Sequence, residues 1–274
     1  MVCLIRDIPI YYEEYGEGKP ALCIHGYSVD HHLMTGCLEP VFAQMSGYRR
    51  IYLDLPGMGK TPAASWIQNA DDMLEIIIGF IQKIVPDENM LLIGESYGGY
   101  LALGLIHNMQ DRIDGLMLIC PVVPAVTDRK TPERCILWKS KDFDMMADDP
   151  DVSAFLGMAV IASPENFQKY KRDVLPGIAL ADGDFLSRYG TGYGFTYEND
   201  LKTIEFDKPT SILTGRQDHV VGYWGAFELL NRFPRATYAV LDCAGHSLQI
   251  ESEPLFALHV KDWIRIVELS ENAD

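Results

Sequence analysis

The chain alternates between short apolar runs and longer stretches in which apolar residues recur with a helical period. The runs at 21–24, 50–53, 90–93, 115–119, 210–213 and 237–241 are short and mostly apolar, which is typical of strands buried on both faces. Between residues 71 and 85, apolar side chains recur every three or four positions until Pro86. This spacing predicts a helix with one buried face.

Further elements complete the alternation. The segments 2–5 and 8–15 read as strands around a turn at Asp7, and helices are expected over about 37–46 and 98–109. Strands that alternate with helices predict an α/β protein with a mainly parallel sheet, covered by helices on both faces.

Residues 121–207 break this rhythm. The segment is too long for a simple loop in a compact domain, and it is rich in methionine and aromatic residues. We interpret it as a helical cap inserted above the sheet edge, so that residues 1–120 and 208–274 form the core domain. Apolar side chains of the cap, with Trp138, Met158 and Tyr193 as examples, are expected to form the roof of a substrate pocket.

Composition narrows the range of partners. Hydrophobic residues make up 48% of the 274 residues, which suffices for a substantial core. The formal net charge of −16 argues against nucleic acid and anionic membranes, because both require a positive surface. It also disfavours a strongly anionic substrate. A small-molecule substrate is therefore expected. The sequence leaves open whether the protein forms a homodimer.

The six cysteines are scattered and include no CxxC pair, so they indicate no zinc or thioredoxin-like site. Cys23 and Cys120 lie inside apolar runs, which is typical of buried free thiols. The chain begins without the basic and apolar pattern of a signal peptide, and no apolar run approaches the roughly 20 residues of a membrane helix. These features predict a reducing, cytoplasmic setting.

The candidate nucleophile is Ser96, in the motif Gly94-Glu95-Ser96-Tyr97-Gly98. A G-x-S-x-G sequence places its serine on a tight strand-to-helix turn, where small neighbours let the backbone fold sharply and leave the hydroxyl exposed. An apolar strand precedes the motif here and a helix follows it, as that geometry requires.

Serine needs an adjacent base to act as a nucleophile near neutral pH. His246 follows the last predicted strand in a glycine-containing loop, and we predict that it is this base. The other histidines that we considered lie in helical stretches, follow the wrong strand or adjoin the proposed acid: His31, His32, His107, His219 and His259.

Asp218 follows the strand at 210–213, and the order serine, aspartate, histidine favours it as the acid that orients the imidazole. Two alternatives remain. Asp242 lies four residues before His246, where it is expected to shape that loop. Asp128 follows the strand at 115–119 at some distance from its end.

Taken together, these motifs resemble the α/β-hydrolase superfamily over nearly the whole chain. The resemblance rests on the strand-to-helix turn at Ser96, called the nucleophile elbow in this family, and on four further motifs in the family's order: His25-Gly26, Asp54-Leu-Pro-Gly57-Met-Gly59, Gly215-Arg-Gln-Asp218 and Ala244-Gly245-His246. It implies an eight-stranded, mostly parallel sheet with a cap, and neither a metal nor an organic cofactor. It also implies an oxyanion hole made by the backbone N–H groups of Tyr27 and Tyr97, with His25 bracing the loop or lining the pocket.

The sequence therefore predicts a serine hydrolase that cleaves a small to medium carboxylester or lactone through an acyl-enzyme on Ser96. Relatives of this fold include C–C bond hydrolases, aminopeptidases, thioesterases and cofactor-free haloperoxidases, and a low-turnover ligand-binding sensor is a further alternative. Epoxide hydrolases and haloalkane dehalogenases carry aspartate at the elbow, which argues against both. Asp54 is expected to cap its own turn, and Glu95 is assigned no catalytic role.

Overall fold

The computed structural model describes residues 1–124 and 131–272. Its centre is a sheet of eight strands, in the order β1-β2-β4-β3-β5-β6-β9-β10 within the described ranges. β2 pairs antiparallel with both of its neighbours, β1 and β4, and the remaining pairs of the sheet are parallel. The predicted mostly parallel, eight-stranded fold is confirmed. The strands are β1 (Val2–Ile5), β2 (Ile8–Tyr15), β3 (Lys19–Ile24), β4 (Tyr48–Leu53), β5 (Met90–Glu95), β6 (Ile113–Ile119), β9 (Thr210–Gly215) and β10 (Ala236–Leu241).

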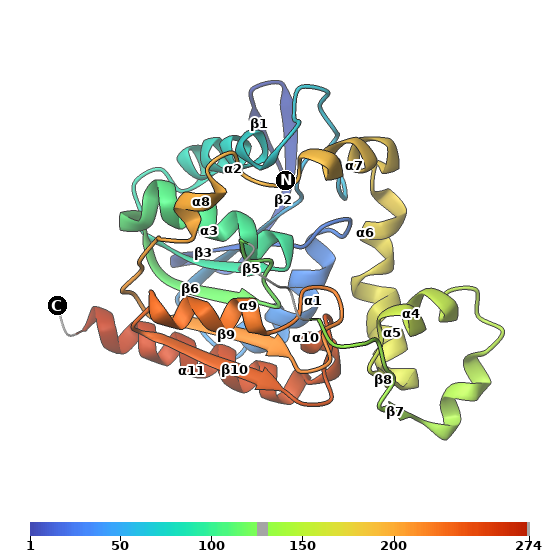
Figure 1. Cartoon of the computed structure of the whole chain (residues 1–274). Coiled ribbons are helices and arrows are strands. Elements are labelled where there is room, and N and C mark those ends of the chain that lie inside the picture. Colours follow the sequence, from blue (N-terminus) through green and yellow to red (C-terminus); the bar gives the residue numbers. More distant parts are fainter. Residues whose placement is uncertain (125–130, 273–274) are drawn as a thin grey trace.

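Helices cover both faces of this sheet (Figure 1). One face packs against α2 (Ala70–Ile84) and α3 (Tyr97–Met109), whose apolar sides form one large cluster with the strands. The other face packs against α1 (His31–Phe42) and α11 (Glu253–Glu271), which form a second cluster. The sheet is thus the middle of three layers, and its buried strands explain the nearly unbroken apolar runs.

The first helix differs from the prediction. It begins at His31 rather than near residue 37, and it ends at Phe42. Asp30 caps it, because its carboxylate accepts a hydrogen bond from the N–H of His32 at 3.0 Å. His31 is also buried, with Nδ1 2.7 Å from Asp54 Oδ1. The hydrophobic pattern did not predict this start, because the helix begins with two polar residues, His31 and His32.

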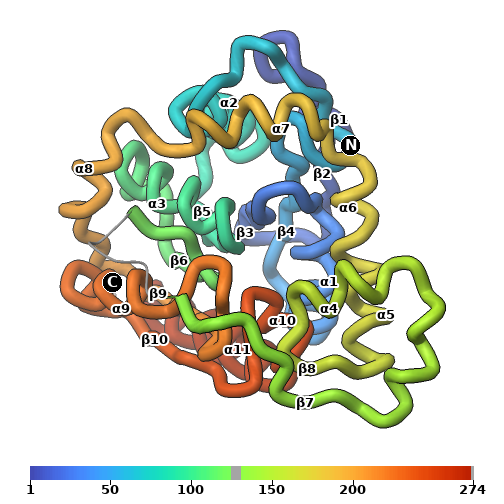
Figure 2. The backbone as a smooth tube through the Cα atoms, turned by 45° about the vertical axis from the view of Figure 1, so that its right-hand side comes forward, coloured from blue at the N-terminus to red at the C-terminus, as the bar shows by residue number. Residues whose placement is uncertain are grey.

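The inserted segment contains helices, as expected, and it divides into two parts (Figure 2). The first part has its own small core, in which Phe143, Phe155 and Phe167 pack together and against Val29 and Leu33 of the core domain. It comprises β7 (Trp138–Lys139), α4 (Val152–Met158), β8 (Ile161–Ala162), α5 (Pro164–Asp173) and α6 (Leu175–Leu180).

The second part, with α7 (Gly183–Tyr189) and α8 (Glu198–Leu201), packs into the large cluster beside α3. The rings of Phe195 and Tyr100, for example, lie 4.8 Å apart. The cap boundaries at 121 and 207 stay a prediction. Shorter elements are α9 (Trp224–Phe227), α10 (Leu248–Glu251) and four 3-10 turns in the described ranges, Gln110–Arg112, Lys141–Met146, Gly190–Gly192 and Glu228–Asn231.

Two smaller expectations concern the cysteines and the membrane. All six cysteines are free, and Cys23 and Cys120 are buried as predicted. In the described part of the chain, no helix combines the length and apolarity needed to cross a bilayer.

Candidate active site

Ser96 lies at the junction of β5 and α3, where the sequence places the elbow. Its φ of +52° is in the left-handed region, which is uncommon for a residue other than glycine and frequent at functional sites. The flanking glycines are required sterically, because a Cβ at Gly98 would lie 2.2 Å from the carbonyl oxygen of Ile24. The chain can therefore turn here only with small residues around the serine.

The structure brings Ser96, His246 and Asp218 together at one edge of the sheet. His246 Nε2 lies 2.9 Å from Ser96 Oγ, and His246 Nδ1 lies 2.9 Å from Asp218 Oδ2. The two partners follow the strands β10 and β9, which run parallel to β5 with β6 between them, so their carboxyl ends lie at the same edge of the sheet as that of β5. Both ring nitrogens of the imidazole are thus engaged, in the arrangement that a nucleophile, base and orienting acid require.

Local interactions hold the acid in place. Asp218 is fully buried, and its Oδ1 accepts hydrogen bonds from the N–H groups of Val220 and Val221 at 2.9 and 3.0 Å. Burial alone would raise the pKa of Asp218, but the neighbouring His246 and these hydrogen bonds lower it below its usual value. Burial alone would lower the pKa of His246, but the charge of Asp218 raises it to about 9.

The alternative acids take other positions. Asp242 Oδ1 accepts a hydrogen bond from Gln217 Nε2 at 3.0 Å, and Gln217 Oε1 in turn accepts one from the N–H of Ala244. Asp242 therefore helps to shape the histidine loop, as expected. Asp128 lies outside the described residues.

The loop after β3 approaches the nucleophile closely. A Cβ at Gly26 would lie 2.2 Å from Glu95 Oε2 and 3.1 Å from Ser96 Cβ, so only glycine fits there. Tyr27 follows in the wall of the cavity, and Tyr97 is the first residue of α3, where helix N–H groups lack intrahelical partners. The oxyanion role of these two N–H groups stays a prediction.

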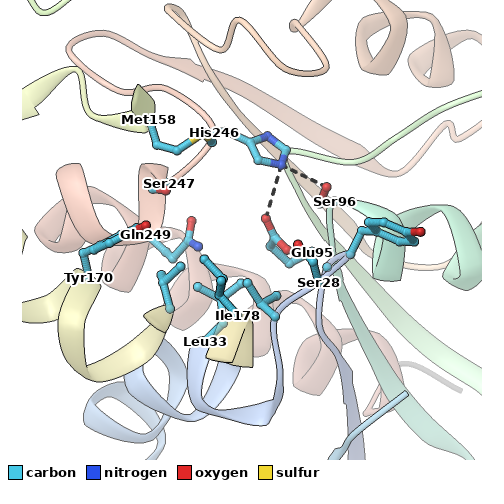
Figure 3. Close-up of a pocket in the computed structure, with 14 residues that line it drawn as sticks. Ser28, Leu33, Glu95, Ser96, Met158, Tyr170, Ile178, His246, Ser247 and Gln249 are labelled. Carbon is cyan, nitrogen blue, oxygen red and sulfur yellow. Dashed lines mark hydrogen bonds and ion pairs between the residues drawn. The ribbon is translucent and has the colours of Figure 1, made fainter. Parts of the chain in front are cut away.

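Beside Ser96 lies a cavity of about 160 Å³ (Figure 3). Its walls come from the core and the cap. They comprise Gly26, Tyr27, Ser28, Val29, Leu33, Glu95, Ser96, Met158, Tyr170, Val174, Ile178, His246, Ser247 and Gln249. Five of these side chains are apolar (Val29, Leu33, Met158, Val174 and Ile178) and two are tyrosines, so the cavity can hold a small substrate with an uncharged apolar portion.

Of the four predicted pocket residues, only Met158 belongs to these walls within the described part of the chain. Trp138 lies on β7 with 54% of its surface exposed. The ring of Tyr193 packs 4.3 Å from that of Tyr97. His25 is buried below the loop, where its Nε2 accepts a hydrogen bond from the N–H of Leu55 at 3.0 Å. None of these three side chains lines this cavity, and their assignment to the substrate pocket stays a prediction.

Glu95 is the residue whose position the sequence did not indicate. Its carboxylate is buried in the cavity wall, and Oε1 lies 3.7 Å from His246 Nε2. Burial raises the pKa of Glu95 to about 7. Every residue of β5 is buried, so no alternation along the strand reveals which side chains face the site.

The structure also brings together side chains that are able to ligate a metal. Cys120 lies with Asp218 and His246, and Asp30 lies with His31 and His32, with the three ligand atoms of each group within 4.8 Å of one another. The first group is part of the site already described. In the second, His31 Nδ1 and His32 Nδ1 are engaged by Asp54 and Asp30. The absence of a metal cofactor stays a prediction.

Comparisons with known proteins agree with this architecture. A family model described as serine aminopeptidase, S33, matches residues 22–253. The crystal structure of an α/β superfamily hydrolase from Oenococcus oeni PSU-1 superposes with a TM-score of 0.89 at 31% identity, covering 98% of this chain and 99% of that one.

Two curated relatives extend the comparison. The AB hydrolase superfamily protein YisY of Bacillus subtilis is 27% identical over an alignment of 267 positions, which covers 90% of this chain and 92% of YisY. A pimeloyl-[acyl-carrier protein] methyl ester esterase of Aeromonas hydrophila is 25% identical over an alignment of 260 positions, which covers 93% of this chain and 96% of the esterase. The chain is therefore a hydrolase of the α/β-hydrolase superfamily and belongs to the family that the serine aminopeptidase S33 model describes.

Proposed function

We propose that this protein is a serine esterase that hydrolyses a small to medium carboxylester or lactone through an acyl-enzyme on Ser96. The observation that carries the proposal is the pair of 2.9 Å contacts that link Ser96 to His246 and His246 to Asp218 beside the cavity. A serine hydroxyl engaged in this way can lose its proton to the imidazole as it attacks a carbonyl carbon.

The first half-reaction forms the acyl-enzyme. His246 Nε2 takes the hydroxyl proton while Ser96 Oγ bonds to the carbonyl carbon, and the carbonyl oxygen becomes an oxyanion. The N–H groups of Tyr27 and Tyr97 donate hydrogen bonds to that oxyanion. The intermediate then expels the alcohol, whose oxygen receives the proton from His246.

The second half-reaction releases the acid. His246 takes a proton from a water molecule, whose oxygen attacks the acyl carbon, and the second oxyanion occupies the same two N–H groups. Collapse returns Ser96 Oγ as the leaving group, and it recovers its proton from His246. Asp218 stays ionised throughout and stabilises the imidazolium, consistent with its lowered pKa.

The size and lining of the cavity support a limited substrate class. Its volume of about 160 Å³ is below the ~300–1,000 Å³ of pockets for drug-sized ligands, which favours a compact substrate. The buried carboxyl of Glu95 and the net charge of −16 disfavour an anionic group close to the scissile bond. The similarity to a methyl ester esterase favours esters over the C–C, amide and haloperoxidase alternatives.

A screen of p-nitrophenyl esters of graded acyl length, with lactones and aminoacyl amides alongside, tests the proposal. Ser96→Ala should reduce turnover by about 10⁴-fold or more and abolish labelling by a fluorophosphonate. Ser187→Ala, which makes the same change at an exposed position on α7, should leave both unchanged. Turnover by Ser96→Ala equal to that of the wild type would refute the assignment, and cleavage of amides alone would make the protein an aminopeptidase.

The cytoplasmic setting and a homodimer stay proposals. The setting is supported by the cysteine usage, since all six thiols are free and Cys135 and Cys243 are partly exposed. Partly exposed thiols of this kind persist in a reducing compartment.

A further inference from the structure

Two polar side chains line the side of the cavity away from Ser96 without a hydrogen-bond partner among the described residues. Gln249 on α10 is 3% exposed, and its Oε1 accepts no hydrogen bond there. Tyr170 on α5 is 4% exposed, and none of the described groups bonds to its hydroxyl. Figure 3 places both side chains across the cavity from Ser96, with the carboxamide of Gln249 turned towards the interior.

Such an arrangement is costly unless a ligand completes it. More than about 90% of buried polar groups in proteins are hydrogen-bonded, and leaving one unpaired destabilises the fold. The neighbouring walls include Leu33, Val174 and Ile178, which offer no side-chain donor or acceptor, and Ser247, whose hydroxyl makes no hydrogen bond with Gln249 or Tyr170 in the described part of the chain. Gln249 Oε1 and the Tyr170 hydroxyl are therefore left to form hydrogen bonds with whatever occupies the cavity, which is water in the free protein and the substrate in the complex.

The surrounding contacts hold Gln249 in position. The next residue, Ile250, is buried in the cap cluster. Glu251 then accepts hydrogen bonds from the N–H groups of Gly245, Val160 and Ile161, at 2.7, 2.5 and 3.1 Å. These contacts tie α10 both to the histidine loop and to the cap. The carboxamide is thus presented to the cavity by a fixed segment, as a binding group should be.

The chemistry of the walls defines the group that fits. No lysine or arginine lines this cavity in the described ranges, so a carboxylate or phosphate would find no counter-charge, and Glu95 lies nearby. A carboxamide and a phenol each donate and accept hydrogen bonds. Their best complement is a neutral group that does both, which is a hydroxyl or another carboxamide.

We propose that Gln249 and Tyr170 form a binding subsite for a neutral hydroxyl or carboxamide group that the substrate carries at a distance from its ester carbonyl. The inference rests on the proposed esterase function and adds a substrate class to it. An ester with a purely apolar tail would bury both side chains unpaired. It should therefore react more slowly than its polar counterpart.

Methyl esters of straight-chain acids of graded length test the subsite, each made with a terminal methyl, hydroxyl, carboxamide or carboxylate group. A second series carries the same groups on the alcohol portion of acetate esters. In the series whose tail enters the cavity, kcat/KM should be higher for the hydroxyl or carboxamide than for the methyl terminus, by about tenfold at the best length. The carboxylate should give the lowest value.

Gln249→Leu removes the carboxamide with little change in volume and should reduce that polar-to-methyl ratio to near one. Tyr170→Phe removes a single oxygen and should reduce it by about threefold or more, which keeps the test available if Gln249→Leu fails to fold. Gln44→Leu makes the matched change at an exposed glutamine whose side chain donates to Pro40, and it should leave the ratio unchanged.

The outcomes separate this inference from the proposed function. If the wild type hydrolyses esters and Ser96 is labelled, but the ratio is near one or is the same in all variants, the subsite is refuted and the esterase stands. If no ester is hydrolysed and a fluorophosphonate leaves Ser96 unmodified, the proposed function fails, and the substrate class fails with it.

Discussion

The contact between Glu95 and His246 leads to a prediction about the pH dependence of catalysis. Glu95 Oε1 lies 3.7 Å from His246 Nε2, the nitrogen that also faces Ser96. An ionised Glu95 stabilises the imidazolium and so raises the pKa of His246. The proposed mechanism needs the neutral imidazole, so the acid limb of the kcat/KM profile should follow the titration of His246. Glu95→Gln removes the charge while it keeps the size of the side chain.

The size of the effect follows from the distance. Coulomb's law at 3.7 Å gives about 1 kcal/mol in a water-like medium and about 4 kcal/mol at the effective dielectric typical of protein sites. One pKa unit corresponds to about 1.4 kcal/mol, so Glu95→Gln should lower the pKa of His246 by about 1 to 3. Glu95 has a pKa of about 7 and is mainly ionised at about pH 8, so at that pH the lowering of the His246 pKa from about 9 should raise kcat/KM by about five- to tenfold.

The assay is the pH profile of kcat/KM for one ester, recorded for the wild type, for Glu95→Gln and for a control. Glu88→Gln is a suitable control, because its side chain is 56% exposed and should leave the profile unchanged. Fluorophosphonate labelling of Ser96 checks that the variants are folded. An acid limb that stays in place in Glu95→Gln, or that moves to higher pH, would show that Glu95 does not act on the charge of His246.

Three further substitutions test the packing around the site. Asp54→Ala should lower the free energy of unfolding, measured in urea, by about 3–5 kcal/mol, because it leaves Nδ1 of the buried His31 without its partner at 2.7 Å; a change smaller than about 1 kcal/mol would contradict this. Gly57→Ala should cost about 1–3 kcal/mol, since φ is +76° and a Cβ would lie 2.2 Å from Phe185 Cδ1, and an unaltered thermal midpoint would count against it. Met158→Ala should raise kcat/KM for longer relative to shorter acyl esters by about tenfold, and an equal ratio would exclude Met158 from the acyl pocket.

Much of the core domain could be predicted because its signals are local. The helix at Ala70–Ile84 and the buried strands follow from the spacing of apolar residues, and their observed bounds differ from the prediction by one or two residues in most cases. The elbow at Ser96 is recognisable within five residues, and Gly94 is needed there because a Cβ would lie 2.5 Å from the carbonyl oxygen of Gly98, whereas Gly98 is needed because of Ile24 on the neighbouring strand β3. The order of the motifs then placed His246 and Asp218 at the same sheet edge, because parallel strands end together.

The walls of the cavity were decided by the tertiary structure. Gln249, Tyr170 and Met158 come from separate segments, and their side chains meet only after the cap folds over the sheet. An apolar residue in the cap can serve the roof, the cap's own core or its outer surface. Trp138 is an example. The composition of the cap led us to expect it in the roof of the pocket, whereas its side chain is largely exposed in the structure. The local pattern thus defines which segments are buried, whereas contacts between distant segments define what each buried side chain faces.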